Sequence, residues 1–251
     1  MRAIDLNADL GEAVDGVATA DDAAMFDLVS SASIACGGHA GDAISMRAAV
    51  AGARERGVAV GAHPSYPDRR GFGRTSMLMD AAALRESVSS QLEALRLAGA
   101  DIRYVKPHGA LYHDAGSRPE VAEVVVEVVQ SLSRDLGRDV PILADGQVLA
   151  ATCAAAGVPF VREGFLDRGY GADGRRVPRG TPGGLLRNPQ KVAARAVRLV
   201  SEGLVTTVEG DDVSVSAQSF CLHGDTPESV ELARAVRRAL AEAGITVRAP
   251  W

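Results

Sequence analysis

Each of the five histidines in this chain lies shortly after a run of residues that predicts a β-strand, and none lies on a predicted helix. The five are His39, His63, His108, His113 and His223. In parallel α/β folds the carboxyl ends of the strands converge at one face, and active sites are built there. Imidazole serves as a general acid or base and as a metal ligand. We therefore expect all five histidines to meet at one face, although a histidine beside glycine can also serve only the backbone of a turn.

Carboxylates follow the same predicted strands. They are Asp9, Glu12, Asp42, Asp68, Asp145, Glu163, Asp167 and Asp225. Asp42 and Asp225 directly precede predicted helices, so ordinary N-capping is the favoured interpretation for both. Asp9 instead sits in a glycine-containing turn, which favours a functional role. A mixed set of carboxylates and imidazoles suits a divalent metal or a general acid–base pair, and the lack of an HExxH motif excludes a zinc site on one helix.

Two basic features accompany these groups. Lys106 ends a predicted strand, where it can bind an anionic substrate, act as a base with a lowered pKa, or simply be solvated. The long segment 164–187 contains arginines that can clamp a carboxylate or a phosphate, or can equally be solvated. They are Arg168, Arg175, Arg176, Arg179 and Arg187. We expect only one or two of them to bind a ligand.

The glycine-rich run 37–41 precedes a predicted helix, where backbone N–H groups can bind an anion. Its sequence, GGHAG, matches neither the GxxxxGK[ST] pattern of a P-loop nor a convincing GxGxxG. The chain therefore lacks the motifs of an autonomous nucleotide-binding site.

These groups need a scaffold, and the sequence supplies alternating strands and helices. The predicted strands are 2–7, 33–36, 58–62, 103–106, 141–144, 158–162 and 220–222. The predicted helices are 21–30, 42–56, 80–98, 119–136, 147–156, 189–202 and 227–243, the last with Asp225 or Thr226 as its N-cap. Strands that alternate with helices form βα units around a parallel sheet.

Seven βα units remain when one predicted β-hairpin is set aside. The hairpin consists of 205–208 and 213–216 around a polar turn. The segment 164–187 is rich in Gly, Arg and Pro, which is typical of a lid or a binding loop. The number of units favours a seven-stranded barrel over an open sheet. No shift in composition marks a boundary, so we expect residues 1–251 to form a single (β/α)-barrel domain.

Composition limits what the chain can bind. The 27 Lys and Arg residues against 32 Asp and Glu give a net charge of −5, which argues against nucleic-acid or anionic-membrane partners. Three widely spaced cysteines without a CxxC pair disfavour a disulfide framework and a cysteine-rich zinc site. Because no leader-like start and no apolar run of ~18 residues is found, we expect a soluble, cytoplasmic protein.

Several long motifs, in order along nearly the whole chain, resemble those of the LamB/YcsF family. They are DLNADLGE (5–12), IACGGHAGD (34–42), GAHPSYPD (61–68), GFGR (71–74), VKPHGALY (105–112), EGF with the following Asp167 and Arg168, and LHGDTP (222–227). Motifs of this length are very specific. The family is that of the A subunit of the bacterial ATP-dependent 5-oxoprolinase.

The resemblance implies an irregular seven-stranded (β/α) barrel of the glycoside hydrolase/deacetylase type, with the hairpin as a small addition. It also implies a hydrolase that works with the B and C subunits to open the lactam ring of 5-oxo-L-proline to L-glutamate, at the expense of ATP with Mg²⁺. A stand-alone metal-dependent amidase or deacetylase is the alternative. A non-catalytic protein that only binds substrate for its partners is the third option, which the density of acid–base groups disfavours.

The expected site has three sets of residues. Those expected to be catalytic are Asp9, His39, His63, Lys106 and His108. Those expected to bind substrate are Asn7, Glu12, Glu163, Asp167, Arg168, His223 and Asp225. Relatives in the superfamily hold a metal with an Asp-His-His set, and by position Asp9, His63 and His108 would fill that role here.

Overall fold

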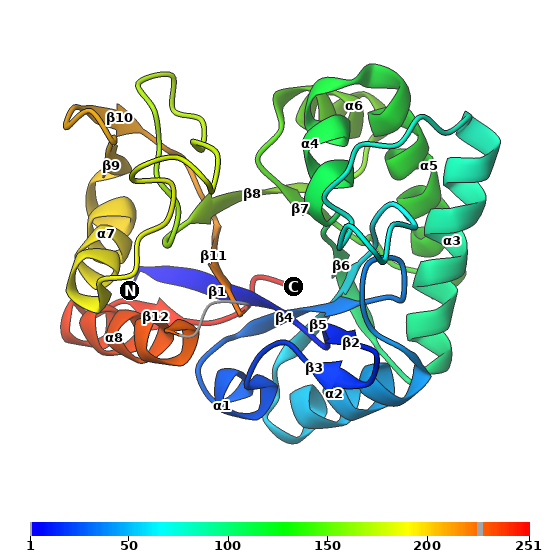
Figure 1. Ribbon diagram of the computed structural model, residues 1–251, viewed down its shortest axis with the longest axis horizontal. Coiled ribbons are helices and arrows are strands. Elements are labelled where there is room, and N and C mark those ends of the chain that lie inside the picture. The colour runs from blue at the N-terminus through cyan, green and yellow to red at the C-terminus, as the bar shows by residue number, and fades with distance from the viewer. Residues whose placement is uncertain (1, 225–227) are drawn as a thin grey trace.

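Seven parallel strands close on themselves at the centre of the computed structural model, which describes residues 2–224 and 228–251 (Figure 1). In chain order they are β1 (Ala3–Leu10), β4 (Ser31–Ala35), β5 (Ala59–His63), β6 (Ile102–Val105), β7 (Ile142–Ala144), β8 (Phe160–Phe165) and β11 (Ser219–His223). Each strand pairs with the next, and β11 returns to β1 with Asp5 opposite Ser219. The predicted seven-stranded barrel is confirmed, and the open sheet is excluded.

The barrel is irregular between β5 and β7. The register of β5 against β6 shifts between Val60 and Gly61, and β6 pairs with β7 through Val105 and Ile142. All the barrel strands nevertheless run parallel. Their carboxyl ends therefore open at one face, as in other parallel barrels.

Helices form an outer ring around the barrel (Figure 1). They are α1 (Asp22–Phe26), α2 (Ala43–Glu55), α3 (Ala81–Leu97), α4 (Gly109–Ser117), α5 (Pro119–Leu136), α6 (Gln147–Ala156), α7 (Pro189–Glu202) and α8 (Ser229–Glu242). In α5, Val121, Val125 and Val128 recur at helical spacing and are buried, so one stripe packs inward. Gly137, in the left-handed conformation, ends this helix. Across the described ranges no helix is long and apolar enough to cross a membrane.

The start of α2 confirms one predicted helix cap. Asp42 caps α2, because its Oδ1 accepts hydrogen bonds from the backbone N–H groups of Ile44 and Ser45, each at 2.8 Å. Helix α8 is described from Ser229, after Glu228, whose side chain makes no capping bond. The predicted helix start at 227 and the predicted N-cap at 225 or 226 fall on residues that lie outside the described part of the chain.

Several short elements are not predicted by the sequence pattern. Helix α4 follows His108 directly and carries His113, so the expectation that no histidine lies on a helix is wrong. Its two glycines have low helix propensity, and packing against α5 and α6 stabilises it. The other additions are β2 (Ala13–Val14), β3 (Val17–Ala18) and β12 (Thr246–Val247). The predicted hairpin is confirmed as β9 (Leu204–Thr206) and β10 (Asp212–Ser214).

The interior of the barrel is polar along β1. Successive side chains of a strand point to opposite faces, so Asp5, Asn7 and Asp9 share the inward face while the alternate apolar residues join the hydrophobic core. Asp5 is buried and accepts hydrogen bonds from the hydroxyl groups of Ser31 and Ser219. Burial raises the pKa of Asp5 despite these bonds. A column of polar contacts therefore leads up the barrel toward Asp9.

Trp251 packs at the end of this polar column that is farthest from Asp9. Its indole Nε1 donates to Ser31 Oγ at 3.0 Å, and its ring stacks on Tyr104 with 4.3 Å between ring centroids. The C-terminus accordingly lies at the centre of the barrel in Figure 1. Tyr104 fills the interior above Trp251 and shares a 3.0 Å hydrogen bond with Ser33 Oγ.

Gly61 makes room for Tyr104. A Cβ atom at position 61 would lie 2.2 Å from Tyr104 Cζ. We expect Gly61→Ala to lower the free energy of unfolding by about 1–3 kcal/mol, the usual effect of overpacking a core, as measured by urea denaturation. Gly180→Ala is the matched control, because no described atom lies within 4 Å of its added Cβ. Equal stability of the two variants would contradict this packing.

Candidate active site

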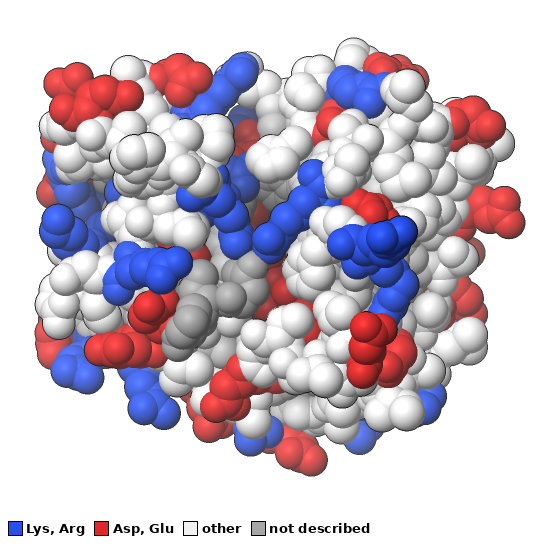
Figure 2. Space-filling model, in the orientation of Figure 1, with Lys and Arg blue, Asp and Glu red and all other residues white. Residues whose placement is uncertain are grey.

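A cavity of about 360 Å³ opens at the carboxyl ends of the strands. Small-molecule sites commonly occupy roughly 300–1,000 Å³, so this cavity suits a small ligand. Basic side chains gather around the hollow at the centre of this face (Figure 2). Four of the five histidines line the cavity, and His39 lies directly behind His108. The structure therefore brings the five histidines together, as the strand ends predict.

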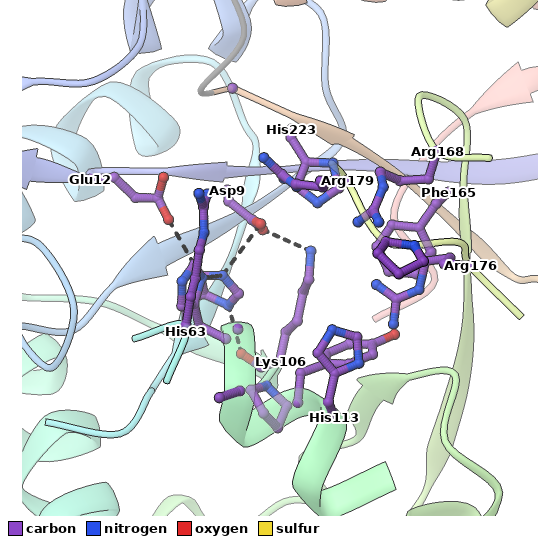
Figure 3. A pocket seen from close by; sticks show the side chains of 18 of the residues that line it. Asp9, Glu12, His63, Lys106, His113, Phe165, Arg168, Arg176, Arg179 and His223 are labelled. Atoms are coloured by element: carbon purple, nitrogen blue, oxygen red, sulfur yellow. Dashed lines mark hydrogen bonds and ion pairs between the residues drawn. The ribbon is translucent and has the colours of Figure 1, made fainter. Parts of the chain in front are cut away.

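The two walls of the cavity differ in charge. Asp9 and Glu12, from the end of β1 and the turn after it, lie on one wall together with His63 (Figure 3). Arg168 and Arg176, from the segment after β8, lie on the opposite wall. A ligand that carries a negative charge at one end only would match this polarity.

Lys106, which follows β6, is the centre of a buried ion-pair network. Its Nζ lies 2.7 Å from Asp9 Oδ1, 2.9 Å from Glu163 Oε1 and 3.1 Å from Asn7 Oδ1. Burial alone would lower the pKa of Lys106, but the nearby carboxylates, Asp9 first, raise it well above its ordinary value. In turn, His63 and Lys106 hold the pKa of Asp9 well below its ordinary value against the effect of burial. Lysine and aspartate are therefore both ionised at neutral pH.

This network revises the expected roles of three residues. Lys106 is a fixed ammonium group rather than a base with a lowered pKa. Asn7 and Glu163 lie beneath it instead of on the cavity wall. Asn7 Nδ2 donates to Glu163 Oε1 at 3.1 Å, and Tyr112 donates its hydroxyl to Glu163 Oε2 at 2.9 Å. Asn7 of β1 and Glu163 of β8 point into the barrel at the same depth as Lys106, which follows β6. Asn7 and Glu163 therefore orient Lys106.

Backbone carbonyl groups fix the tautomers of His63 and His108. His63 Nδ1 lies 2.7 Å from the carbonyl oxygen of Lys106, and His108 Nε2 lies 3.0 Å from that of Phe72. A carbonyl oxygen can only accept, so each of these nitrogens carries a proton. The other two nitrogens, His63 Nε2 and His108 Nδ1, face each other at 2.9 Å. Two neutral imidazoles would present two lone pairs here, so the arrangement requires a proton or a metal ion between them.

Glu12 and His39 complete this cluster. Glu12 Oε1 lies 3.0 Å from His39 Nε2 and 3.6 Å from His108 Nδ1. Burial lowers the pKa of His39 and of His108 well below the ordinary value, so both rings are neutral at pH 7. His39 Nδ1 is buried without a hydrogen-bond partner among the described residues. With His63, these residues form a buried His/Glu cluster that could bind a divalent metal.

The cluster differs from the Asp-His-His set expected from the family pattern. Asp9 Oδ2 lies 3.4 Å from His63 Nε2, but its Oδ1 is bound to Lys106. Glu12 supplies the carboxylate that lies within 4.8 Å of all three imidazole donors. Asp9 is ion-paired with the Lys106 ammonium group, which competes with a metal ion for the carboxylate. Glu12 is therefore the stronger candidate for a metal ligand. The turn between β1 and β2 brings Glu12 there. The sequence pattern predicts a glycine-containing turn in this region but places Asp9 in it, whereas Asp9 lies within the longer strand β1.

Arg168 both lines the cavity and holds the segment after β8 in place. Its Nε donates to the carbonyl of Gly184 at 3.1 Å, and its Nη2 donates to that of Val177 at 2.7 Å. Burial and repulsion from Arg176 and Arg179 lower the pKa of Arg168 to about 10. This wall therefore carries a concentrated positive potential.

Asp167 orients His223 at the end of β11. Its Oδ2 lies 2.9 Å from His223 Nδ1 and accepts the backbone N–H of the same histidine at 3.1 Å. A carboxylate accepts, so Nδ1 carries the proton. His223 lines the cavity and Asp167 lies behind it. The expected role of Asp225 stays a prediction, because this residue lies outside the described ranges.

One residue of the site, Tyr112, is not predicted by the sequence pattern. It reaches the cavity from α4, a helix that the pattern misses, and the predicted His113 reaches the cavity from the same helix. Asp145 follows β7 and pairs with Arg176, whose Nη2 lies 3.1 Å from Asp145 Oδ2. In the sequence, only the position of Asp145 directly after a predicted strand indicated that it would lie at this face.

The sequence matches one protein family over almost its whole length. The LamB/YcsF family matches residues 4–250. The chain belongs to the LamB/YcsF family. This LamB/YcsF chain is 48% identical over 250 residues to a protein from Nocardia farcinica that is named as the A subunit of 5-oxoprolinase, with 98% of each covered.

Solved structures agree with the fold of this LamB/YcsF chain. The crystal structure of a lactam utilization protein from Thermus thermophilus is similar with a TM-score of 0.91 and 39% identity, covering 99% of this chain and 100% of that one. The polysaccharide deacetylase Bc1974 from Bacillus cereus gives a TM-score of 0.50 at 12% identity, covering 100% and 93%. This second likeness concerns the fold alone, and it agrees with the predicted barrel of the deacetylase type.

Proposed function

We propose that this chain is the A subunit of an ATP-dependent 5-oxoprolinase and opens the lactam ring of 5-oxo-L-proline to give L-glutamate. The observation that carries the proposal is a small cavity with one acidic, histidine-lined wall and one basic wall, in a chain whose relatives bear the name of that A subunit. 5-Oxoproline carries a carboxylate on one side of its ring nitrogen and the lactam carbonyl on the other. Its two ends therefore suit the two walls.

The groups at the cavity match the needs of lactam hydrolysis. The Lys106 ammonium group, fixed beside Asp9, would stabilise the negative charge that develops on the lactam oxygen. The facing nitrogens of His63 and His108 would either hold a metal ion or share a proton that can be donated to the ring nitrogen when the amide bond breaks. The arginine wall would bind the carboxylate and so hold the ring in one orientation.

The residues present fit a divalent metal ion. Glu12, His39, His63 and His108 would hold it, and the carbonyl groups that bind two of these imidazoles would keep their nitrogens aimed at it. A divalent ion bound there would act as a Lewis acid on a carbonyl oxygen.

We infer that the ATP site belongs largely to the partner B and C subunits. A lactam is an unstrained amide that hydrolyses slowly, and phosphorylation of its oxygen would create a better leaving group. The chain has no P-loop spacing to bind the triphosphate. We expect the isolated chain to bind Mg·ATP weakly and to hydrolyse it at no useful rate, as measured by titration calorimetry. Micromolar affinity that is lost in Arg168→Ala or Lys106→Ala would place the nucleotide site here and contradict the inference.

Turnover of 5-oxoproline by the purified chain, alone and with candidate partners, with and without ATP, tests the proposal. The proposal requires glutamate to form only when the partners and ATP are all present. ATP-independent amide hydrolysis by the chain alone would instead support the metal-dependent amidase or deacetylase. Full turnover by a complex that contains the His63→Ala chain would support a non-catalytic role for this chain.

A further inference from the structure

Arg176 is held rigidly at the basic wall of the cavity. Its guanidinium carbon lies 3.9 Å from the ring centroid of Phe165 and 4.8 Å from that of Tyr112. Its Nη2 lies 3.1 Å from Asp145 Oδ2, and its side chain is only 10% exposed. An arginine fixed on aromatic rings loses little conformational freedom when it binds a ligand. Arg176 is therefore preorganised for a planar anion.

The hydrogen bonds of the two wall arginines separate their roles. Arg168 donates Nε and Nη2 to carbonyl groups of its own segment, so much of its guanidinium maintains the loop. Arg176 reaches Asp145 through Nη2 alone. Within the described part of the chain, this leaves its Nε and Nη1 for a ligand. Forked pairs between a guanidinium and a carboxylate use two such N–H groups.

The surroundings of Arg176 favour an anion. Arg168 and Arg179 converge on the same side of the cavity (Figure 3). His113 also lines this side, and burial, with the charge of Arg176 second, lowers its pKa, so its ring is neutral at pH 7 and the positive charge here comes from the arginines. A carboxylate placed here would interact with the whole positive wall, while Lys106 and His63 face the other end of the ligand.

We propose that Arg176 determines specificity by binding the substrate carboxylate, so that the site accepts lactams with a carboxylate beside the ring nitrogen and discriminates against uncharged lactams. The inference rests on the proposed function and deepens it. Asp145 is then a positioning residue, because its contact with Nη2 sets the orientation of the guanidinium group.

Calorimetric titration of the full chain with two lactams tests this role. The ligands are 5-oxoproline and 2-pyrrolidinone, which is the same ring without the carboxylate. We expect Arg176→Met to weaken the binding of 5-oxoproline by about 30-fold or more, because a buried charge pair is lost, and to leave 2-pyrrolidinone binding unchanged. Arg176→Lys should restore part of the loss. Arg175→Met is the matched control, because the Arg175 side chain is 84% exposed and Arg175 is not part of the cavity wall.

The outcomes separate the inference from the function it rests on. If Arg176→Met binds 5-oxoproline as tightly as the unchanged chain, or weakens both lactams equally, Arg176 does not recognise the carboxylate. If the unchanged chain binds 5-oxoproline no better than 2-pyrrolidinone, the inference is overturned as well. If it binds neither lactam, both the inference and the proposed function are overturned. Thermal melting of each variant verifies that it is folded.

Discussion

Replacing His63 by alanine should lower kcat for 5-oxoproline hydrolysis in the assembled enzyme by about 100-fold or more, with a smaller change in KM. The substitution removes one of the two nitrogens that face each other at 2.9 Å. Whether these nitrogens hold a metal ion or share a proton, the chemistry needs both nitrogens. Steady-state kinetics of the reconstituted complex measures the effect. We expect His108→Ala and Asp9→Ala to behave in the same way.

His113→Ala is the matched control for these variants. His113 lines the same cavity but lies on α4 at the opposite wall, away from the His/Glu cluster. It should lower kcat far less than His63→Ala does. A near-normal kcat in any of the three variants at the acidic wall would remove that residue from the catalytic set.

Lys106→Met should cause the largest loss of stability of any single substitution in the site. It leaves Asp9 and Glu163 buried without the ammonium group that lies within 2.9 Å of both. Breaking a buried ion pair by removing one partner typically costs about 3–5 kcal/mol of unfolding free energy. Denaturation in urea, monitored by circular dichroism, measures the change.

A second substitution shows whether Lys106→Met lowers stability through the unpaired carboxylates or through lost side-chain packing. Glu163→Gln, added to Lys106→Met, removes one of the two stranded charges and keeps an amide oxygen that can accept the hydroxyl of Tyr112. The double variant should therefore be more stable than Lys106→Met alone. If the double variant is no more stable, the loss comes from packing and not from the unpaired carboxylates.

The longer elements could be predicted because their signals are local. The predicted bounds of α5, 119–136, and of α6, 147–156, are those of the structure, since a first-turn proline starts α5 and a left-handed glycine follows each helix. Helix α4 and strand β12 were missed because distant parts of the chain stabilise them. Strand β12, for example, exists only as a partner for the start of β1.

The location of the site could be predicted, but the hydrogen bonds and ion pairs between its side chains could not. Strand ends placed Asp9, His63 and Lys106 at one face because parallel strands must end together. The alternation of Asp5, Asn7 and Asp9 along one strand was a readable signal for a polar interior. The bond between Glu12 and His39, by contrast, depends on a turn and a loop whose side chains meet only in the folded barrel.

The most direct measurement is a crystal structure of the chain with bound 5-oxoproline. We expect the carboxylate of the ligand within hydrogen-bond distance of Arg176, and the lactam carbonyl facing Lys106 and His63. That orientation follows from the opposite charges of the two walls. A ligand bound with its carboxylate toward Asp9 and Glu12, or bound outside this cavity, would contradict the proposed site.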